Sequence, residues 1–134
     1  MVIVVRKDLK EMMKKKGKIA AQVSHAVLGA ILSQTHREYY ETQYSFEPNL
    51  VLPIDFESPL TIWLNNSFTK VCVGVNSEQE LLDLYEKVKD NFIHKLILDD
   101  GRTCFNNIPT YTCLAIGPAF NEDFVGITDH LSLL

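Results

Sequence analysis

The chain has 134 residues, of which 46% are hydrophobic and 22% charged, a size and composition that fit one globular domain and exclude an intrinsically disordered chain. No apolar run is long enough to cross a bilayer, and charged residues interrupt the apolar start Met1–Val5 before it reaches the length of a signal peptide. We therefore expect a soluble, cytoplasmic protein without a membrane partner.

The net charge of −4 is divided unevenly along the sequence. Residues 1–18 hold seven basic and two acidic side chains, a net charge of +5, whereas the rest of the chain holds six basic and fifteen acidic ones. This asymmetry predicts a basic edge on an acidic body, and such an edge can hold phosphates although the total charge is negative. From charge alone, a solvated lysine-rich loop explains the same residues equally well.

The first predicted element is a strand over Val2–Val5, which is continuously apolar and β-branched, as is typical of a strand covered on both faces. A charged connection follows over Lys7–Lys16. A helical pattern then begins near Gly17 and is expected to run to about Tyr40, although its periodicity is lost after His36.

Residues 41–59 carry three prolines and show neither helical nor strand periodicity. Because a proline restricts its own backbone and that of the residue before it, this stretch predicts an irregular insertion. Part of it is expected to pack on the body through the apolar residues Leu50, Val51, Leu52, Ile54 and Phe56.

The second half of the chain alternates helices and strands. The capping-box pattern Ser77–Glu80 marks one helix start, because the serine can cap a backbone amide while the glutamate reaches back. We expect helices at Leu60–Asn66, from the capping box to about Asn91, and at Glu122–Ile127 with Asn121 as its cap, and strands at Val71–Val75, Leu96–Leu98 and Thr112–Ile116. The last residues, His130–Leu134, are expected to close the fold as a strand or as an extended tail.

This order of elements predicts an α/β fold, a single domain over residues 1–134 with a mixed four-stranded β-sheet and helices packed on both faces. The cysteines are scattered, without a CxxC motif or a cysteine–histidine pair at metal-ligand spacing, so we expect no disulfide, no structural metal and no cofactor. The sequence also lacks a P-loop, a glycine-rich dinucleotide turn and a GxSxG elbow, which disfavours nucleotide hydrolysis, redox and serine-hydrolase chemistry.

Four residues of the first predicted helix share one stripe: Lys18, Gln22, His25 and Gly29. The small and apolar residues beside them allow the helix to pack closely on a sheet, which leaves the polar stripe at the edge of the packed surface, within reach of a substrate. An amphipathic helix with a histidine at the edge of the core explains the pattern too, and the pattern alone favours that interpretation.

Several segments resemble the type 2 peptidyl-tRNA hydrolases of archaea and eukaryotes. They are the first strand with Asp8-Leu9, the helix opening Gly17–Gln22 (GKIAAQ) with Ser24–Ala26, the turn Asp99–Thr103 (DDGRT, beside DAGRT in the family), the strand end Leu114–Pro118 and the C-terminal Ile127–Leu134. The resemblance covers both ends and the middle of the chain, with the motifs in the family's order.

The chain departs from the family pattern in a few places. It has extra residues before Gly17 and a longer region before Trp63. Asp100 stands where the family normally has alanine, which puts a second carboxylate beside Asp99. Ser67–Lys70 stands in place of a Gly-Gln-x-Lys entry to the next strand, so the motif glutamine is absent.

The resemblance implies hydrolysis of the ester that joins a peptide to the terminal ribose of tRNA, a reaction of translation and ribosome rescue that recycles the tRNA. The implied catalytic residues are Lys18, His25, Asp99, Thr103 and Thr112. The expected tRNA-binding residues, which include the basic edge, are Lys7, Lys10, Lys14, Lys15, Lys16, Gln22 and Arg102.

Individual roles follow from the chemistry of an activated ester, which needs an oriented water and a stabilised oxyanion. Lys18, at a helix start, is expected near the oxyanion or the terminal phosphate. Asp99 is a candidate either to position Lys18 or to act as the base, and His25 is the second candidate base. Thr112 matches the family only with a one-residue gap, and Arg102 is a candidate phosphate clamp.

A second hypothesis keeps the fold but changes the function. In it the chain is an RNA- or protein-binding module, in which Asp100 and the long insertion have disabled or redirected catalysis. The retained polar residues favour the enzyme. Because the family often forms homodimers, a homodimer is also possible.

Overall fold

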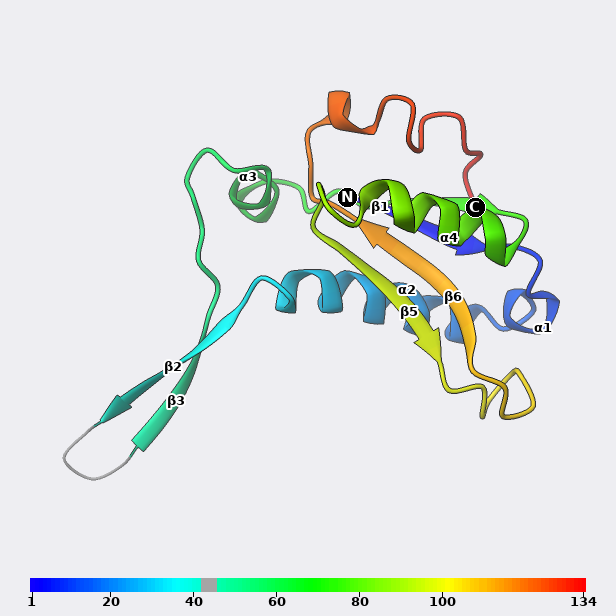
Figure 1. Cartoon of the computed structure of the whole chain (residues 1–134), viewed down its shortest axis with the longest axis horizontal. Helices are drawn as coiled ribbons and strands as arrows, with labels where there is room; N and C mark the ends of the chain where they lie inside the picture. The colour runs from blue at the N-terminus through cyan, green and yellow to red at the C-terminus, as the bar shows by residue number, and fades with distance from the viewer. Residues whose placement is uncertain (42–45) are drawn as a thin grey trace.

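The computed structural model describes residues 1–41 and 46–134, which form six strands, four α-helices and one 3₁₀ helix. In chain order these are β1 (Val2–Arg6), α1 (Lys10–Met13), α2 (Lys16–Leu32), β2 (His36–Glu41), β3 (Phe46–Val51), α3 (Pro59–Asn65), β4 (Val71–Val75), α4 (Glu78–Val88), β5 (His94–Asp99), β6 (Thr110–Ile116) and η1 (Asn121–Phe124) (Figure 1).

The main sheet has the strand order β4-β1-β6-β5. Strand β1 lies inside it, parallel to β4 and antiparallel to β6, while β5 pairs antiparallel with the outer side of β6. The apolar run that predicted a buried strand explains this position, because Ile3, Val4 and Val5 are fully buried. The predicted α/β class and mixed four-stranded sheet are confirmed.

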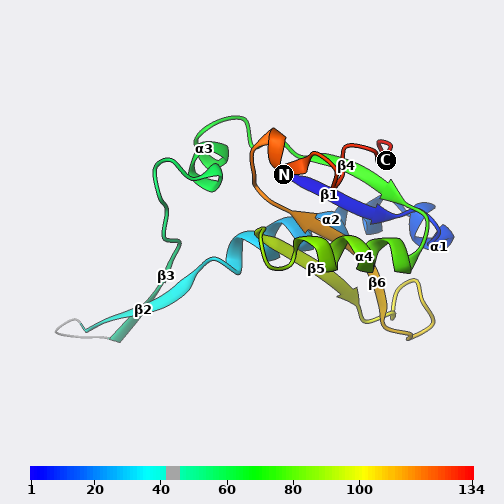
Figure 2. The same cartoon turned by 45° about the horizontal axis from the view of Figure 1, so that its top comes forward.

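Helices cover both faces of this sheet, as predicted. Helix α2 packs on β5, β6 and β1, and α4 packs on β6 and β1. Two apolar clusters result, one under α4 around Leu81 and Val88, the other under α1 and α2 around Met12 and Ala26. In Figure 2, α4 lies in front of the strands and α2 passes behind them.

Helix α2 ends at Leu32, so the prediction that it continues to about Tyr40 is wrong. Two hydroxyl side chains satisfy carbonyl groups of its last turn: Ser33 Oγ donates to Ala30 O and Thr35 Oγ1 donates to Leu32 O, both at 2.7 Å. Such local side-chain hydrogen bonds compete with further helical ones, and the chain leaves the helix there.

The next segment is a β-hairpin rather than a helix end and an irregular insertion. Strand β2 pairs antiparallel with β3, with His36 opposite Val51 and Tyr39 opposite Pro48. A proline is tolerated in β3 because, within the described chain, this strand pairs with β2 alone and needs no second ladder of hydrogen bonds. The predicted irregularity is therefore wrong for 46–51, and residues 42–45 lie outside the described residues.

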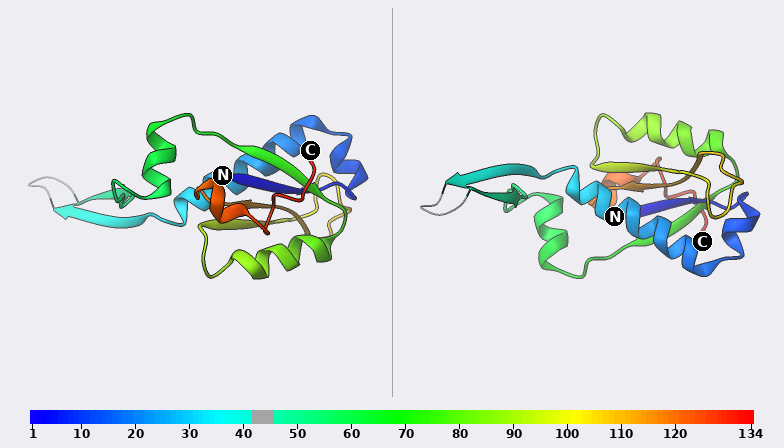
Figure 3. Two further views of the ribbon diagram at one scale, coloured as in Figure 1. Left: turned by 90° about the horizontal axis from the view of Figure 1, so that it is seen from above. Right: turned by 90° about the horizontal axis from the view of Figure 1, so that it is seen from below.

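We call residues 36–57, the hairpin and the linker to α3, the arm. Figures 1 and 3 show the hairpin projecting from the body of the molecule. The prediction that its apolar residues pack on the body is wrong for most of them: Leu50 and Ile54 are exposed, and Phe56 is 85% exposed, whereas Val51 and Leu52 are half-buried.

The second half of the chain follows the sequence more closely. Helix α3 is capped by Ser58 and α4 by Ser77, whose Oγ accepts from the Glu80 amide at 3.1 Å while Glu80 Oε2 accepts from Asn76. Helix α4 ends at Val88, three residues earlier than predicted. The last helix is a short 3₁₀ turn in which Asn121 is its first residue and not its cap.

The C-terminal residues form an extended tail along β4. The Gly74 amide donates to Ser132 O and the Leu134 amide to Cys72 O, both at 3.0 Å, and Val73 forms a β-bridge with Leu133. The tail therefore covers the outer edge of β4. Of the helices that the structure describes, none has the length and apolar character to cross a membrane.

Candidate active site

The site forms where the first turns of α2 meet the end of β5. Lys18, in the first turn of α2, places its Nζ 2.5 Å from Asp99 Oδ2, although 81 residues separate the two in sequence. Asp99 is the last residue of β5 and is 8% exposed. The cation is thus held against a buried carboxylate.

Two further side chains continue this contact into the protein. Gln22, one helical turn after Lys18, donates from Nε2 to Asp99 Oδ2 at 2.8 Å. Thr112, on β6, donates from Oγ1 to Gln22 Oε1 at 2.6 Å. Both Gln22 and Thr112 are buried, and their hydrogen bonds fix the orientation of the Gln22 amide. The chain Thr112–Gln22–Asp99–Lys18 therefore runs from the core to the surface.

The other carboxylate oxygen of Asp99 is held by the turn after β5. The Gly101 amide donates to Asp99 Oδ1 at 2.9 Å. Gly101 has φ +82°, and a Cβ there would lie 2.3 Å from Ile108 O, so this position requires glycine. The glycine of the DDGRT motif is thus part of the geometry that holds Asp99.

Opposing influences act on the pKa of Asp99. Burial raises it, but hydrogen bonds from Lys18 and from the Gly101 amide, together with the positive charge of Lys18, lower it by more. The pKa of this carboxyl group consequently lies below its ordinary value. Asp99 is ionised at neutral pH and stays paired with Lys18.

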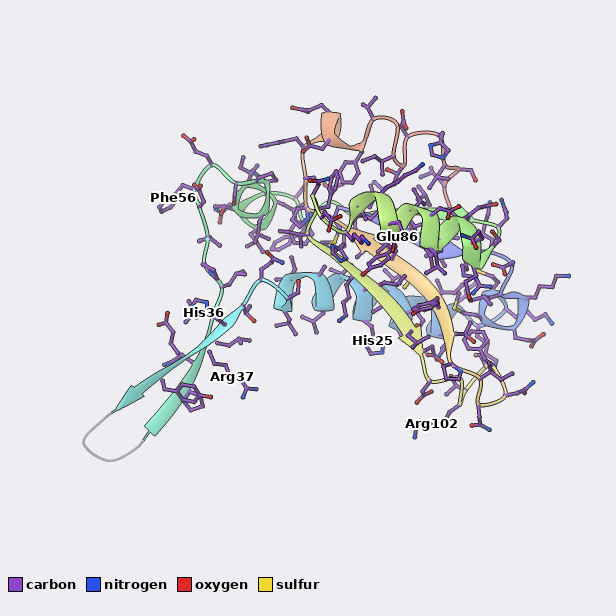
Figure 4. The ribbon with its side chains drawn as sticks, in the orientation of Figure 1. His25, His36, Arg37, Phe56, Glu86 and Arg102 are labelled. Atoms are coloured by element: carbon purple, nitrogen blue, oxygen red, sulfur yellow. The ribbon has the colours of Figure 1, made fainter. Side chains whose placement is uncertain are left out.

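A pocket of about 510 Å³ opens beside this ion pair. The residues that line it are Lys18, Ala21, Gln22, His25, Ile97, Leu98, Asp99, Asp100 and Thr103. His25 is exposed on α2 and makes no side-chain hydrogen bond or ion pair with another residue of the described ranges. Figure 4 shows His25 on α2 and Arg102 on the β5–β6 loop.

Four of the five predicted catalytic residues line this pocket, and the fifth lies behind it. Lys18, His25, Asp99 and Thr103 are lining residues, whereas Thr112 is fully buried and reaches the ion pair through Gln22. Gln22, expected to bind tRNA, is buried between Asp99 and Thr112. The shared stripe of Lys18 and Gln22 was the signal that could have placed it here.

Asp100, the residue that departs from the family pattern, turns to the neighbouring arginine. Its carboxylate accepts from Arg102 Nε at 2.6 Å and from the Arg102 amide at 3.0 Å. These two hydrogen bonds lower the pKa of Asp100. Asp100 lines the pocket without displacing Lys18 from Asp99.

The lysines of the predicted basic edge do not all lie beside the pocket. Lys15 Nζ lies 3.3 Å from Thr103 O, next to the pocket, and Lys10, Lys14 and Lys16 are exposed around α1 and the start of α2. Lys7, by contrast, lies over Gly74 of β4, with its Nζ 3.4 Å from Ser132 Oγ.

Arg6, which contributes to the positive charge of this segment, is not available to a ligand. It is buried, and its guanidinium donates to Asp8, Glu78 and the Tyr111 carbonyl. The exposed positive charge that residues 1–18 contribute therefore comes from their lysines.

Fold and pocket together define a small α/β protein with a charged surface site, in which a lysine is held by a buried carboxylate beside an open pocket. The family model described as "Peptidyl-tRNA hydrolase PTH2" matches residues 1–134.

Proteins named peptidyl-tRNA hydrolase are similar to the chain over its whole length. One from Methanothermobacter thermautotrophicus is 38% identical over 136 residues, covering 99% of this chain and 97% of that protein. One from Methanocaldococcus jannaschii is 34% identical over 134 residues, covering 100% and 98%. A Drosophila melanogaster protein, "Probable peptidyl-tRNA hydrolase 2", is 36% identical over 135 residues, covering all of this chain and 61% of that protein. The chain belongs to the PTH2 family of peptidyl-tRNA hydrolases, enzymes that act on an ester bond.

Proposed function

We propose that the pocket around Lys18 and Asp99 is the catalytic centre at which the chain hydrolyses the ester between a peptide, or an N-blocked aminoacyl group, and the 3′-terminal ribose of tRNA. The observation that carries this assignment is the Lys18–Asp99 ion pair beside an open pocket. The family match supplies the substrate class.

Lys18 is suited to stabilise the oxyanion that forms when water attacks the ester carbonyl. An aminoacyl ester is already activated, so a covalent nucleophile is not required, and a fixed positive charge lowers the barrier directly. The Lys18 side chain is 15% exposed, so one side of it faces the pocket. Its position in the first turn of α2 adds the positive end of the helix dipole.

Asp99 is better suited to position Lys18 than to remove a proton from water. Its two oxygens already accept hydrogen bonds from Lys18, Gln22 and the Gly101 amide. Its pKa lies below the ordinary value, which makes the carboxylate a weak base. We assign Gln22 and Thr112 as positioning residues that hold Asp99 in turn.

His25 is then the candidate general base, with Thr103 beside it to orient the water. Both line the pocket and both are exposed, so a water molecule can reach them. An imidazole can take the proton of the attacking water and later return it to the ribose oxygen.

The exposed lysines on the pocket side are proposed to hold the tRNA backbone. Lys15 lies next to Thr103, and Lys10, Lys14 and Lys16 surround it on α1 and the start of α2. Arg102 is held by Asp100 through Nε, and its terminal nitrogens make no hydrogen bond or ion pair with another described residue, which suits a phosphate clamp. Lys7 would contribute only to a substrate that extends across β1 towards β4.

We further propose that residues 1–134 are one domain of this family with the arm as an insertion, that the protein works in the cytoplasm in ribosome rescue, and that it forms a homodimer. The binding-module hypothesis rested on Asp100, on the long insertion and on the missing glutamine. Asp100 pairs with Arg102 and leaves Lys18 on Asp99, which supports the enzyme against the first of these three grounds.

The decisive experiment measures release of the N-blocked amino acid from N-acetyl-aminoacyl-tRNA by the wild type and by Lys18→Ala and Asp99→Asn. Lys18→Ala should lower kcat by roughly 10²- to 10³-fold, as loss of an oxyanion donor does. Lys87→Ala, an exposed lysine on α4, is the matched control and should leave turnover unchanged. Turnover that survives both site substitutions in folded protein refutes the assignment of the centre.

The base is identified by the pH dependence of kcat/KM. If His25 is the base, His25→Ala should abolish the ascending limb of the profile, whereas Asp99→Asn should lower the whole curve without removing that limb. The reverse pattern would make Asp99 the base.

A further inference from the structure

One edge of the main sheet is open, and it ends at the proposed catalytic centre. Strand β5 lies at the end of the strand order, and within the described chain β6 is the only strand that pairs with it. The opposite edge, on β4, is covered by the C-terminal tail. An uncovered edge presents a row of backbone N–H and C=O groups that can accept another extended chain.

Two pockets follow this edge along its whole length. The pocket of the proposed centre includes Ile97, Leu98 and Asp99 of β5. A second pocket of about 500 Å³ includes His94, Lys95 and Leu96. Every residue of β5 therefore borders one of the two pockets.

Helix α2 forms a wall beside this edge. Ala21, His25 and Leu32 lie at helical spacing and are exposed. Near the start of β5 the stem of Lys95 lies over Gly29, where a Cβ would be only 2.8 Å from Lys95 Cγ. This side of α2 is thus partly apolar, and the helix contacts β5 at both ends of the strand, through Lys95 and through Asp99.

We propose that the open edge of β5 binds the peptide part of the substrate as an additional strand. This inference rests on the proposed function, which puts the ester carbonyl beside Lys18 and Asp99. The esterified, C-terminal end of the peptide then lies beside Asp99, at the C-terminal end of β5. The N-terminal part of the peptide lies towards His94, so the peptide and β5 run parallel. The six residues of β5 span roughly 20 Å.

This mode of binding matches the chemistry of the substrate. Peptides attached to tRNA have no fixed sequence, so a site for them gains from contacts that every peptide can make. Backbone hydrogen bonds to a strand edge are such contacts, because they depend on the amide groups and not on the side chains. Lysines on the other side of Lys18 remain free for the tRNA.

Amide hydrogen exchange of the wild-type protein tests the proposal. The probe is a five-residue N-acetyl peptide joined through an amide to 3′-amino-3′-deoxyadenosine, which the enzyme cannot hydrolyse as an ester. Alternate amides of His94–Asp99, which lack a partner in β6, should exchange quickly in the free protein and slowly with the probe bound. Amides of Val71–Val75, on the covered edge, should not change.

Which backbone amides are protected from exchange decides between the proposal and its alternatives. Probe bound without protection in β5 overturns the proposal. Protection of β5 that grows with protein concentration in the absence of the probe assigns the edge to a second copy of the chain, and overturns it too.

A kinetic measurement checks the same contacts from the substrate side. Peptidyl-tRNAs with one N-methylated residue lose a single backbone donor, which should raise KM by roughly 2- to 10-fold at alternate positions with kcat unchanged. Side-chain changes at the same positions should have little effect. Equal KM for all N-methylated substrates refutes the added strand. Failure of the proposed centre would appear separately, as turnover that survives Lys18→Ala.

Discussion

At the scale of single residues, Gln22 is the connection between the core and the ion pair. It is buried, donates to Asp99 and accepts from Thr112, so its amide can do nothing else without leaving a buried polar group unpaired. A residue in this position acts through Asp99 and Lys18, and its loss should affect the rate of the chemical step more than the binding of tRNA.

Gln22→Leu is expected to lower kcat by roughly tenfold to a hundredfold with KM nearly unchanged, because Asp99 loses its fixed orientation. It should also lower the free energy of unfolding by about 1–3 kcal/mol, since Thr112 and Asp99 each lose a partner. The double variant Gln22→Leu/Thr112→Val, which removes both polar groups of the inner contact, should recover much of that stability without recovering kcat. Urea unfolding and steady-state kinetics measure the two effects; a recovered kcat would make Gln22 merely structural.

Asp99 also predicts how stability depends on pH. Its pKa in the folded chain lies below the ordinary value of 3.8, so the unfolded chain binds this proton more readily. The stabilisation is therefore fully present above about pH 4 and is lost as the pH falls through the lower, folded-state pKa. Urea unfolding between pH 7 and pH 2 should show the difference between wild type and Asp99→Asn narrowing below about pH 4. The exposed Asp90→Asn is the control and should show no such narrowing.

The sequence could indicate much of the site because its residues lie in short motifs. Lys18 and Gln22 share a helical stripe, and Asp99 ends an apolar strand directly before a glycine turn. The orientation of Gln22 could not be predicted, because it depends on how closely α2 packs on β5 and β6. The same holds for the separation of Lys7 from Lys15, which results from the position of β4 at the far edge of the sheet.

At the scale of elements, the four strands of the main sheet and α4 were predictable because each combines a strong apolar pattern with clear local signals, such as the Ser77 cap. The end of α2 could not be predicted in this way. The hydroxyl contacts of Ser33 and Thr35 stop the helix locally, while the hairpin that follows is set by pairing between β2 and β3. Pro48 argued against a strand, because a proline cannot donate to a ladder of hydrogen bonds. It is tolerated in β3 because that strand belongs to a two-stranded sheet and has only one ladder to form.

The hairpin of the arm should be removable without loss of the fold. His36 lies opposite Val51 at the base of the hairpin, so residues 37–50 can be replaced by two glycines that join paired positions. The shortened chain is expected to unfold within a few degrees of the wild type and to hydrolyse N-acetyl-aminoacyl-tRNA at a similar rate, since β2 and β3 pair with neither of the described sheet edges. Thermal unfolding by circular dichroism and the release assay measure both; a folded but inactive protein would place substrate contacts on the arm.

At the scale of the whole molecule, charge near α1 is expected to govern tRNA affinity. Reversing Lys14, Lys15 and Lys16 to glutamate should raise KM for every tRNA sequence and reduce the dependence of affinity on salt, because phosphate contacts release counterions. Lys87→Glu on α4 is the control for a charge reversal outside this segment. Filter binding between 50 and 200 mM salt measures the slope; an unchanged slope in the triple variant would exclude this segment as the tRNA contact.

The projecting arm has one more consequence, for the way the enzyme and its substrate meet. Residues 36–57 contain one basic and five acidic side chains, a net charge of −4, while residues 1–18 carry +5. Figure 1 shows α1 and the hairpin at opposite ends of the longest axis, so these two segments contribute a dipole along the length of the molecule. In the field of a polyanion such a dipole experiences a torque that turns the α1 end forward and the arm away. Most encounters at low ionic strength then begin in a productive orientation, and the association rate constant should fall as the Debye length shortens to about 10 Å near 0.1 M salt.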